Sequence, residues 1–298
     1  MILVVGATGF LGNTVCQLLA REGRPLRAVV RPSSNPVLVD ALREVGAELV
    51  QADLKDRASL DRACRGVDTV ISTATATMRD QAADSLTDVD HQGQLQLVEA
   101  AREAGVRHFV YVSYPNSLDG DQPSPLSQAK RGVERHLMES GMTYTILQPV
   151  PFMEAWLSPG LGFDYPNGRV QVPGEGDRPV GWISLGDVAR YVVASLDRPE
   201  ARNTVLPLVA ENRSMNEIIR TFEEATGRPF EVQHIPAEAL RAQRDGGGTP
   251  LERSFGALML TVAQGAAVEQ DDRQRAFGIT PMTVREYAHQ VAVPTPAT

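Results

Sequence analysis

Short apolar runs alternate with segments of helical periodicity along the first half of the chain. The apolar runs predict strands at residues 2–5, 26–30, 48–52, 69–72, 108–113 and 143–147. The segments between them predict helices at residues 13–21, 36–45, 59–64, 88–104 and 127–140. Because a single helix separates each strand from the next, right-handed crossover connections are expected. The pattern therefore predicts an α/β fold with a doubly wound parallel sheet of the Rossmann type.

This alternation ends after Pro149. Residues 151–181 are rich in proline and glycine and include four aromatic residues, which is typical of a loop-rich pocket wall. Beyond them, the pattern predicts helices at 185–196, 214–226 and 283–291, strands at 204–208 and 230–234, a flexible connection at 245–250 and a frayed C-terminal tail. We expect a Rossmann domain over residues 1–150 and a smaller substrate lobe over 151–298. The lobe is interleaved with the domain, and helix 185–196 packs back on the sheet.

Three glycines follow the first predicted strand at a three-residue spacing, Gly6, Gly9 and Gly12, and a helix follows them. Glycines at these positions allow the backbone to approach a phosphate closely. The helix N-terminus then directs unpaired N–H groups and a positive dipole end toward that anion. A glycine turn with only a packing role is the alternative. The position of the triplet between a strand and a helix favours a dinucleotide site.

The composition limits the classes of partner. The 298-residue chain has a formal charge of -8, which argues against a general nucleic-acid surface and against binding to anionic lipid. It has no run of about 18 apolar residues, so no transmembrane helix is expected, and we expect no cleaved signal peptide before the first strand. Its two cysteines, Cys16 and Cys64, do not have metal-ligand spacing, so we predict no metal site and a reducing cytoplasm. Nothing in the sequence indicates an oligomeric state.

The residue after the second strand discriminates between the two nicotinamide dinucleotides. An acidic residue there would accept hydrogen bonds from the adenosine ribose, but this chain has Arg31. A guanidinium is suited to a 2′-phosphate, so we predict NADP(H), with NAD(H) as the alternative and Ser33 and Ser34 as further contacts. Arg31 as a solvated charge at a strand end is the competing interpretation. Asp53 is placed to bind the adenine amino group or to cap a turn.

Several motifs together resemble a known family. They are Val-Val-Gly-Ala-Thr-Gly-Phe-Leu-Gly at 4–12, Val-Val-Arg-Pro at 29–32, Ala-Asp-Leu-Lys-Asp at 52–56, Tyr-Val-Ser at 111–113, residues 129–134, 144–152 and 183–189. Over residues 1–230 the chain resembles the atypical short-chain dehydrogenases/reductases, in particular the NmrA-like and isoflavone-reductase-like branch. The resemblance implies an NAD(P)-binding domain, a small substrate lobe and reduction of an organic acceptor. The predicted cofactor contacts are Gly6, Thr8, Gly9, Phe10, Leu11, Gly12, Arg31, Ser33, Ser34, Asp53, Leu54, Thr73, Ala74, Lys130, Pro149, Val150 and Phe152.

The chain departs from the usual short-chain reductase pattern at one position. Those enzymes have a tyrosine four residues before the lysine, and this chain has Leu126 four residues before Lys130. Ser113 occupies the place of the family's serine at the end of the fifth strand. We therefore predict Lys130 and Ser113 as the catalytic pair. For Lys130, proton transfer, binding of the nicotinamide ribose and a surface position remain alternatives.

A quinone-like or other conjugated aromatic acceptor does not require a protein proton donor, because its charge spreads over the conjugated system. The backbone of Val150 and the ring of Phe152 are predicted to contact the nicotinamide. The substrate pocket is predicted to consist of Tyr114, Phe152, Met153, Trp156 and Tyr165, with core packing as their alternative role. The favoured function is an NADPH-dependent oxidoreductase with a small-molecule acceptor. The competing functions are a non-catalytic dinucleotide sensor or assembly factor with a protein partner, and an enzyme acting on a nucleotide sugar.

Overall fold

The computed structural model describes residues 1–292, and the chain forms two compact units. We call the first the sheet unit; it consists of Met1–Ser113, Pro125–Gln148 and Val188–Leu206. The second, the lobe unit, consists of Tyr114–Ser124, Pro149–Asp187 and the chain from Pro207 onward. The chain passes between the two units more than once.

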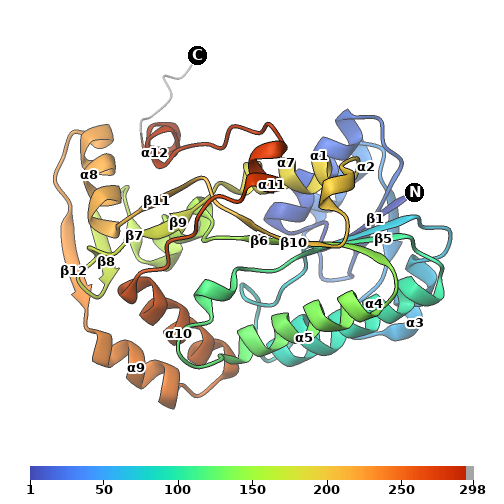
Figure 1. The fold of residues 1–298 in the computed structure, drawn as a ribbon, viewed down its shortest axis with the longest axis horizontal. Helices are drawn as coiled ribbons and strands as arrows, with labels where there is room; N and C mark the ends of the chain where they lie inside the picture. The colour runs from blue at the N-terminus through green and yellow to red at the C-terminus, as the bar shows by residue number, and fades with distance from the viewer. Residues whose placement is uncertain (293–298) are drawn as a thin grey trace. The chain divides into compact units, whose positions relative to one another are not determined.

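A seven-stranded sheet forms the centre of the sheet unit (Figure 1). Its strands are β1 (Ile2–Val5), β2 (Leu26–Val30), β3 (Glu48–Gln51), β4 (Thr69–Ser72), β5 (His108–Val112), β6 (Thr143–Pro149) and β10 (Thr204–Leu208). They are ordered β10-β6-β5-β4-β1-β2-β3, and the pairs from β3 to β6 are parallel. The strand order reverses beside β1, where open α/β sheets bind ligands at the carboxyl ends of the strands. The predicted doubly wound α/β fold is confirmed.

Helices cover both faces of this sheet (Figure 1). One face carries α1 (Phe10–Arg21), α2 (Pro36–Glu44) and α7 (Leu185–Ser195), and the other carries α3 (Arg57–Ala63), α4 (Gln94–Glu103) and α5 (Pro125–Glu139). A short 3-10 helix, η4 (Pro199–Ala201), precedes β10. The apolar runs of the inner strands are buried because they lie between these two helical layers, whereas the edge strand β3 is only partly buried.

The helix predicted at residues 88–104 is in fact two elements. A π-helix, η1 (Leu86–Gly93), begins after Ser85, whose hydroxyl accepts the N–H of Asp88 at 3.1 Å, and α4 follows directly. Gly93 allows close packing at the junction, since a Cβ there would lie 2.7 Å from the Cβ of Leu54. The wider π turn, a feature frequent at functional sites, carries Asp90 into the interior of the sheet unit.

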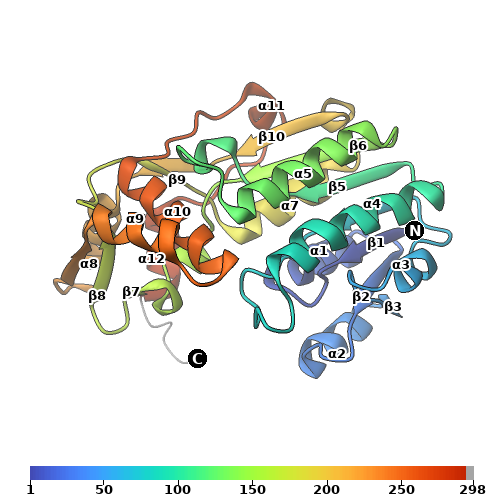
Figure 2. The ribbon, with the colours of Figure 1, turned by 90° about the horizontal axis from the view of Figure 1, so that it is seen from below.

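The lobe unit contains two small sheets and a group of helices. Its strands are β7 (Phe163–Asp164), β8 (Arg169–Pro173) and β12 (Glu231–Ile235) in one sheet, and β9 (Val180–Trp182) and β11 (Glu211–Arg213) in the other. Its helices are η2 (Asn116–Leu118), α6 (Met153–Trp156), η3 (Pro159–Leu161), α8 (Met215–Thr226), α9 (Ala237–Gly246), α10 (Pro250–Gln264), α11 (Asp272–Ala276) and α12 (Val284–Ala292). Helices α9 and α10 lie side by side (Figures 1 and 2). The core includes Phe163 and Phe222, whose rings meet edge-on at 4.8 Å.

The sequence missed several short elements of the second half. Within the loop-rich segment 151–181 the structure has short strands and helices, and the lobe has more strands of its own than the two predicted. Residues 245–250 include the end of α9 and the start of α10, and residues 247–249 connect the two helices, with a capping box formed by Thr249 and Glu252. The flexibility predicted for this connection stays a prediction. The strands are at most five residues long and α9 is strongly polar, which left weak periodicity to detect.

The helix predicted at residues 214–226 is confirmed as α8, and Ser214 is its N-cap, where its hydroxyl and Glu217 form a capping box. The tail predicted to fray, residues 293–298, lies outside the described residues. Within residues 1–292, no helix is long and apolar enough to cross a membrane.

Candidate functional site

The glycine turn between β1 and α1 brings three backbone segments into close approach. The N–H of Gly9 donates to the carbonyl of Gly6 at 2.9 Å, and Gly6 has a φ of +88°. A Cβ on Gly6 would lie 2.8 Å from the nitrogen of Ala74, and a Cβ on Gly12 would lie 2.2 Å from the carbonyl oxygen of Gly6. Larger residues would therefore separate α1 from the turn. This cradle fits the pyrophosphate of a dinucleotide.

The N-terminus of α1 has the character of an anion site. Gly9 is its N-cap and makes no side-chain capping bond, and the first turn of this helix contains no acidic residue. The first N–H groups of the helix are thus left for a ligand or water. Leu11 is buried beneath the turn, whereas the ring of Phe10 is 82% exposed beside it.

Arg31 lies directly after β2 and is part of an ionic cluster. Its backbone N–H donates to the hydroxyl oxygen of Ser34 at 2.9 Å, and that hydroxyl lies 3.4 Å from the hydroxyl of Thr8 in the glycine turn. Its guanidinium Nη1 donates to Oδ2 of Asp84 at 2.7 Å and lies 3.9 Å from Oδ2 of Asp53. Arg31 is therefore a paired cation and not a solvated strand-end charge.

The remaining adenosine-side residues lie around this cluster. Oδ1 of Asp53 accepts the N–H of Lys55 at 2.9 Å, which is the turn-capping role given as its alternative. Leu54 is buried and Ser33 is exposed. Binding of adenine by Asp53 and of phosphate by Ser33 stay predictions.

The segment after β4 forms the floor of the cradle. The hydroxyl of Thr73 donates to the carbonyl of Val5 at 3.2 Å, and the carbonyl of Ala74 accepts the amide of Gln94 at 3.0 Å. Gln94 is itself held by the hydroxyl of Ser72 at 2.8 Å. These bonds keep Ala74 against Gly6, as close approach to a ligand backbone requires.

A buried ion pair joins α5 and η1 in the sheet unit. Nζ of Lys130 is 3.2 Å from Oδ1 of Asp90, and both residues are buried, at 5% and 0% exposed. The other oxygen of Asp90 accepts the N–H of Ala76 at 2.8 Å, and Nζ lies 5.2 Å from the ring centre of Tyr111. Lys130 is thus not a surface lysine, which removes one of its three predicted roles.

The ion pair determines the protonation state of Lys130. Burial lowers the pKa of its ammonium, but Tyr111 and Asp90 together outweigh burial, and the net shift is upward. Burial raises the pKa of Tyr111 to about 12. At neutral pH Lys130 is therefore an ammonium, and Tyr111 is a neutral phenol. The sequence pattern missed both Asp90 and Tyr111, since an acid in a helix and a tyrosine in a strand carried no spacing signal.

The family's serine and tyrosine positions are both buried. Ser113 follows β5, and its hydroxyl is buried without a hydrogen-bond partner among residues 1–292. Leu126 is buried in the first turn of α5, so an aliphatic side chain occupies the place of the usual phenol. A role for Ser113 in catalysis stays a prediction.

Residues predicted to lie near the nicotinamide belong to the lobe unit and to its boundary. Pro149 and Val150 are buried, and the N–H of Val150 donates to the carbonyl of Leu208 at 3.0 Å. This N–H is therefore already bonded to the backbone and is not available to the nicotinamide. Phe152 is half-buried and forms an isolated bridge with Ile183.

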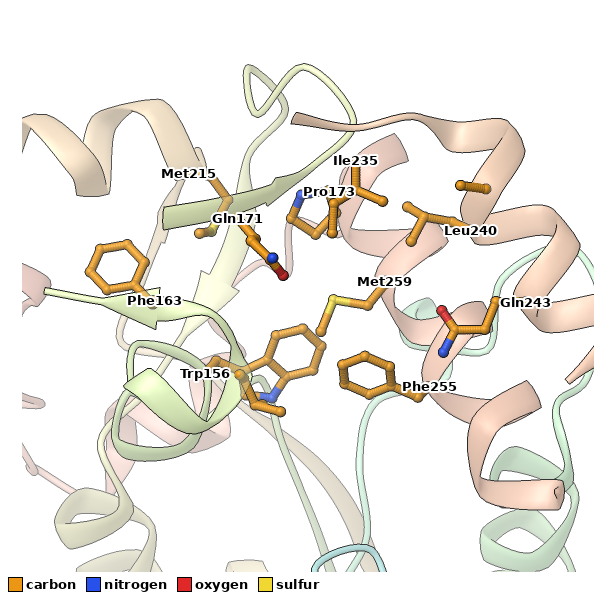
Figure 3. A pocket seen from close by; sticks show the side chains of 12 residues that line it. Trp156, Phe163, Gln171, Pro173, Met215, Ile235, Leu240, Gln243, Phe255 and Met259 are labelled. Carbon is orange, nitrogen blue, oxygen red and sulfur yellow. The ribbon is translucent and has the colours of Figure 1, made fainter. Parts of the chain in front are cut away.

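The predicted pocket residues largely take the core-packing role. Met153 is fully buried in the lobe core, and Tyr114 and Tyr165 pack against that core. Trp156 also packs there, but it additionally lines a cavity of about 120 Å³ (Figure 3). The cavity is lined by Trp156, Leu161, Phe163, Gln171, Pro173, Met215, Ile235, Ala239, Leu240, Gln243, Phe255 and Met259.

The residues that line this cavity are mainly apolar, and Gln171, Gln243 and the indole of Trp156 contribute polar groups (Figure 3). Its volume is close to that of a cavity that accepts one aromatic ring. The sequence missed it because α9 and α10, which supply part of its wall, were not predicted. In the described part of the chain, no group of three or more histidine, cysteine or acidic residues is arranged to hold a metal ion.

The fold and the glycine cradle define a Rossmann-type dinucleotide-binding protein, and the comparisons narrow this class. The NmrA-like family model matches residues 1–288. The chain is 32% identical over 301 residues to "Isoflavone reductase homolog IRL" of Zea mays, covering 94% of this chain and 89% of that protein. It is 30% identical to "Photosystem II assembly factor Ycf39" of Trieres chinensis, covering 80% and 73%. The chain therefore belongs to the NmrA-like family.

Its fold is also that of a solved structure, the Escherichia coli NADPH-dependent quinone oxidoreductase QOR2 complexed with NADPH. The two superimpose with a TM-score of 0.78 and 21% identity, over 98% of this chain and 99% of that chain.

Proposed function

We propose that this protein is an NADPH-dependent reductase of a quinone-like or other conjugated aromatic acceptor. The observation that carries the proposal is the glycine cradle with two cations, Arg31 and Lys55, beside the end of β2. A guanidinium and an ammonium at this edge suit a 2′-phosphate better than a bare ribose. The family relatives named as reductases, and the fold shared with an NADPH-bound quinone reductase, support the same assignment.

The bound dinucleotide would supply the hydride, and the chain's residues would hold it and the acceptor. The cradle around Gly6, Gly9 and Gly12 would bind the pyrophosphate through backbone N–H groups. Lys130 would act as a fixed cation toward ribose hydroxyls. A group whose pKa is raised well above neutral is a poor proton donor at pH 7, so ribose binding is favoured over acid catalysis.

The absence of a phenol at position 126 limits the acceptor. Reduction of a simple ketone needs a proton at the developing alkoxide, whereas a quinone spreads the added charge over its conjugated system. The apolar cavity beside Trp156 supports an aromatic acceptor, because it has room for one ring and two amide groups to orient it.

Cofactor binding and turnover by the purified protein test this proposal. We expect NADPH to bind and to be consumed with a panel of naphthoquinones and benzoquinones. Lys130→Ala is expected to weaken NADPH binding and turnover together if it holds the ribose. A loss of turnover at unchanged affinity would instead assign it proton transfer. NADPH bound without consumption by any acceptor would refute the reductase.

A dinucleotide-binding assembly factor is the second candidate. The relative that carries that description, Ycf39, and the buried Leu126 favour it. It predicts NADPH binding without consumption and a defined protein partner recovered with the NADPH-bound protein. Turnover of quinones at rates typical of enzymes, about 1 s⁻¹ or more, would count against it.

A further inference from the structure

Asp84 is the centre of the ionic cluster on the adenosine side of the cradle. Its Oδ2 accepts Nη1 of Arg31 and its Oδ1 accepts Nζ of Lys55, each at 2.7 Å. The side chain of Asp84 is only 11% exposed, so little water reaches the carboxylate. Nζ of Lys55 also donates to the carbonyl of Ala83 at 2.7 Å, which fixes the backbone beside Asp84.

The cluster is balanced in charge. Arg31 and Lys55 contribute two positive charges, and Asp84 and Asp53 contribute two negative charges within the same group. A 2′-phosphate carries close to two negative charges at neutral pH and needs the same donors. A cluster with no net charge attracts the phosphate only weakly until a carboxylate breaks its hydrogen bonds with the two cations.

We propose that Asp84 is a specificity-determining carboxylate that competes with the 2′-phosphate of NADP(H) for Arg31 and Lys55. This inference rests on the proposed NADP(H) site. Binding of the phosphate exchanges the hydrogen bonds of Asp84 for phosphate bonds, and the carboxylate turns to water. NADH, whose ribose has a 2′-hydroxyl, makes no comparable demand on these two cations. Asp84 therefore lowers the preference of the site for NADP(H).

Taken alone, the sequence motif overstates the preference for NADP(H), because it shows Arg31 after the second strand without the carboxylate that pairs with it. Asp84 lies 53 residues further along the chain, in the segment before η1, so no local pattern connects it to Arg31. Only the fold brings the carboxylate to the guanidinium.

The test measures binding at the adenosine end by calorimetry, using adenosine 2′,5′-bisphosphate and ADP together with NADPH and NADH. For Asp84→Asn we expect affinity for the two 2′-phosphorylated ligands to rise roughly 10- to 100-fold. Affinity for ADP and NADH should change less than about 2-fold. Asp84→Ser is the second variant, in case the first does not fold, and melting temperatures verify folding of each.

Asp80→Asn is the matched control. Asp80 is an exposed carboxylate in the same segment, and its Oδ1 accepts the N–H of Ala82 rather than contacting either cation. It should leave all four affinities unchanged. In Arg31→Ala/Asp84→Asn, most of the gain should disappear, because the gain acts through the guanidinium.

Four results would overturn the inference. Weaker binding of NADPH to Asp84→Asn would mean that Asp84 orients Arg31 for the phosphate. Equal gains in Asp80→Asn and Asp84→Asn would show a general effect of charge. Wild-type protein that binds neither NADPH nor NADH would refute the proposed cofactor site and the inference with it. NADPH binding with no change in Asp84→Asn or Asp84→Ser refutes the inference alone.

Discussion

Removal of Asp90 is expected to destabilise the sheet unit strongly, because it leaves the buried ammonium of Lys130 unpaired. At 3.2 Å and an effective dielectric constant of about 20, the attraction between the two charges is about 5 kcal/mol. Desolvation of both groups offsets part of it, and breaking one partner of such a pair typically costs about 3–5 kcal/mol. Asp90→Asn also weakens the bond from the N–H of Ala76. We expect a loss of about 3 kcal/mol at pH 7.

Thermal unfolding measured by circular dichroism detects this loss. For a unit of about 150 residues, about 3 kcal/mol corresponds to a decrease in melting temperature of roughly 6–12 °C. Lys130→Met should cost a similar amount, because it leaves the carboxylate of Asp90 buried without its cation. The double variant Asp90→Asn/Lys130→Met removes both charges. Its loss of unfolding free energy should be smaller by at least about 2 kcal/mol than the sum of the losses of the two single variants.

A small effect would refute this reasoning. If Asp90→Asn changes the melting temperature by less than about 2 °C, or if the two substitutions are additive, the ion pair does not hold the site together. Lys130 would then need another partner to remain charged in the interior.

Three further predictions follow from the local environments. Gly12→Ala should destabilise the protein and abolish NADPH binding in a calorimetric titration, because the added Cβ would lie 2.2 Å from the carbonyl oxygen of Gly6. Gly186→Ala is the control, since its Cβ would lie 3.8 Å from the nearest atom. Equal effects of the two substitutions would contradict the role of Gly12 in the cradle. Burial lowers the pKa of His108 to about 4, below its unfolded value of about 6.5, so the unfolded chain binds the extra proton between these values. The free energy of unfolding should therefore fall by about 2–3 kcal/mol as the pH decreases from 6.5 to 4. In urea unfolding, His108→Gln should show a weaker dependence of this free energy on pH. An unchanged pH dependence would contradict the role given to His108. Burial raises the pKa of Cys16 and Cys64 to about 12, so iodoacetamide should label them only after unfolding, as followed by mass spectrometry.

The sheet unit was predictable to a large extent from the sequence. Its strands are continuous apolar runs, and its helices are amphipathic with glycine stops, so each element carried its own signal. The glycine cradle was predictable for the same reason. Gly9 and Gly12 approach Gly6 within a few residues of chain, although the approach of Gly6 to Ala74 depends on the pairing of β1 with β4.

The lobe was less predictable because its signals are short. Strands of two to five residues, and the polar helix α9, have too few positions to show a period. The cavity beside Trp156 depends on α9 and α10, which were not predicted. Met153, predicted to line the substrate pocket, instead packs in the core of the lobe.

By itself, the sequence determined the dinucleotide fold, the positions of the cradle glycines and the loss of the usual phenol at Leu126, because these are local properties of neighbouring residues. Only the tertiary structure decided which charges meet. Asp90 reaches Lys130 across 40 residues of chain, and Asp84 reaches Arg31 across 53. Such pairs depend on how strands and helices are stacked, and no spacing along the chain encodes them. The cofactor cradle can therefore be predicted from the sequence, whereas the charge pairs around it can be found only from the fold.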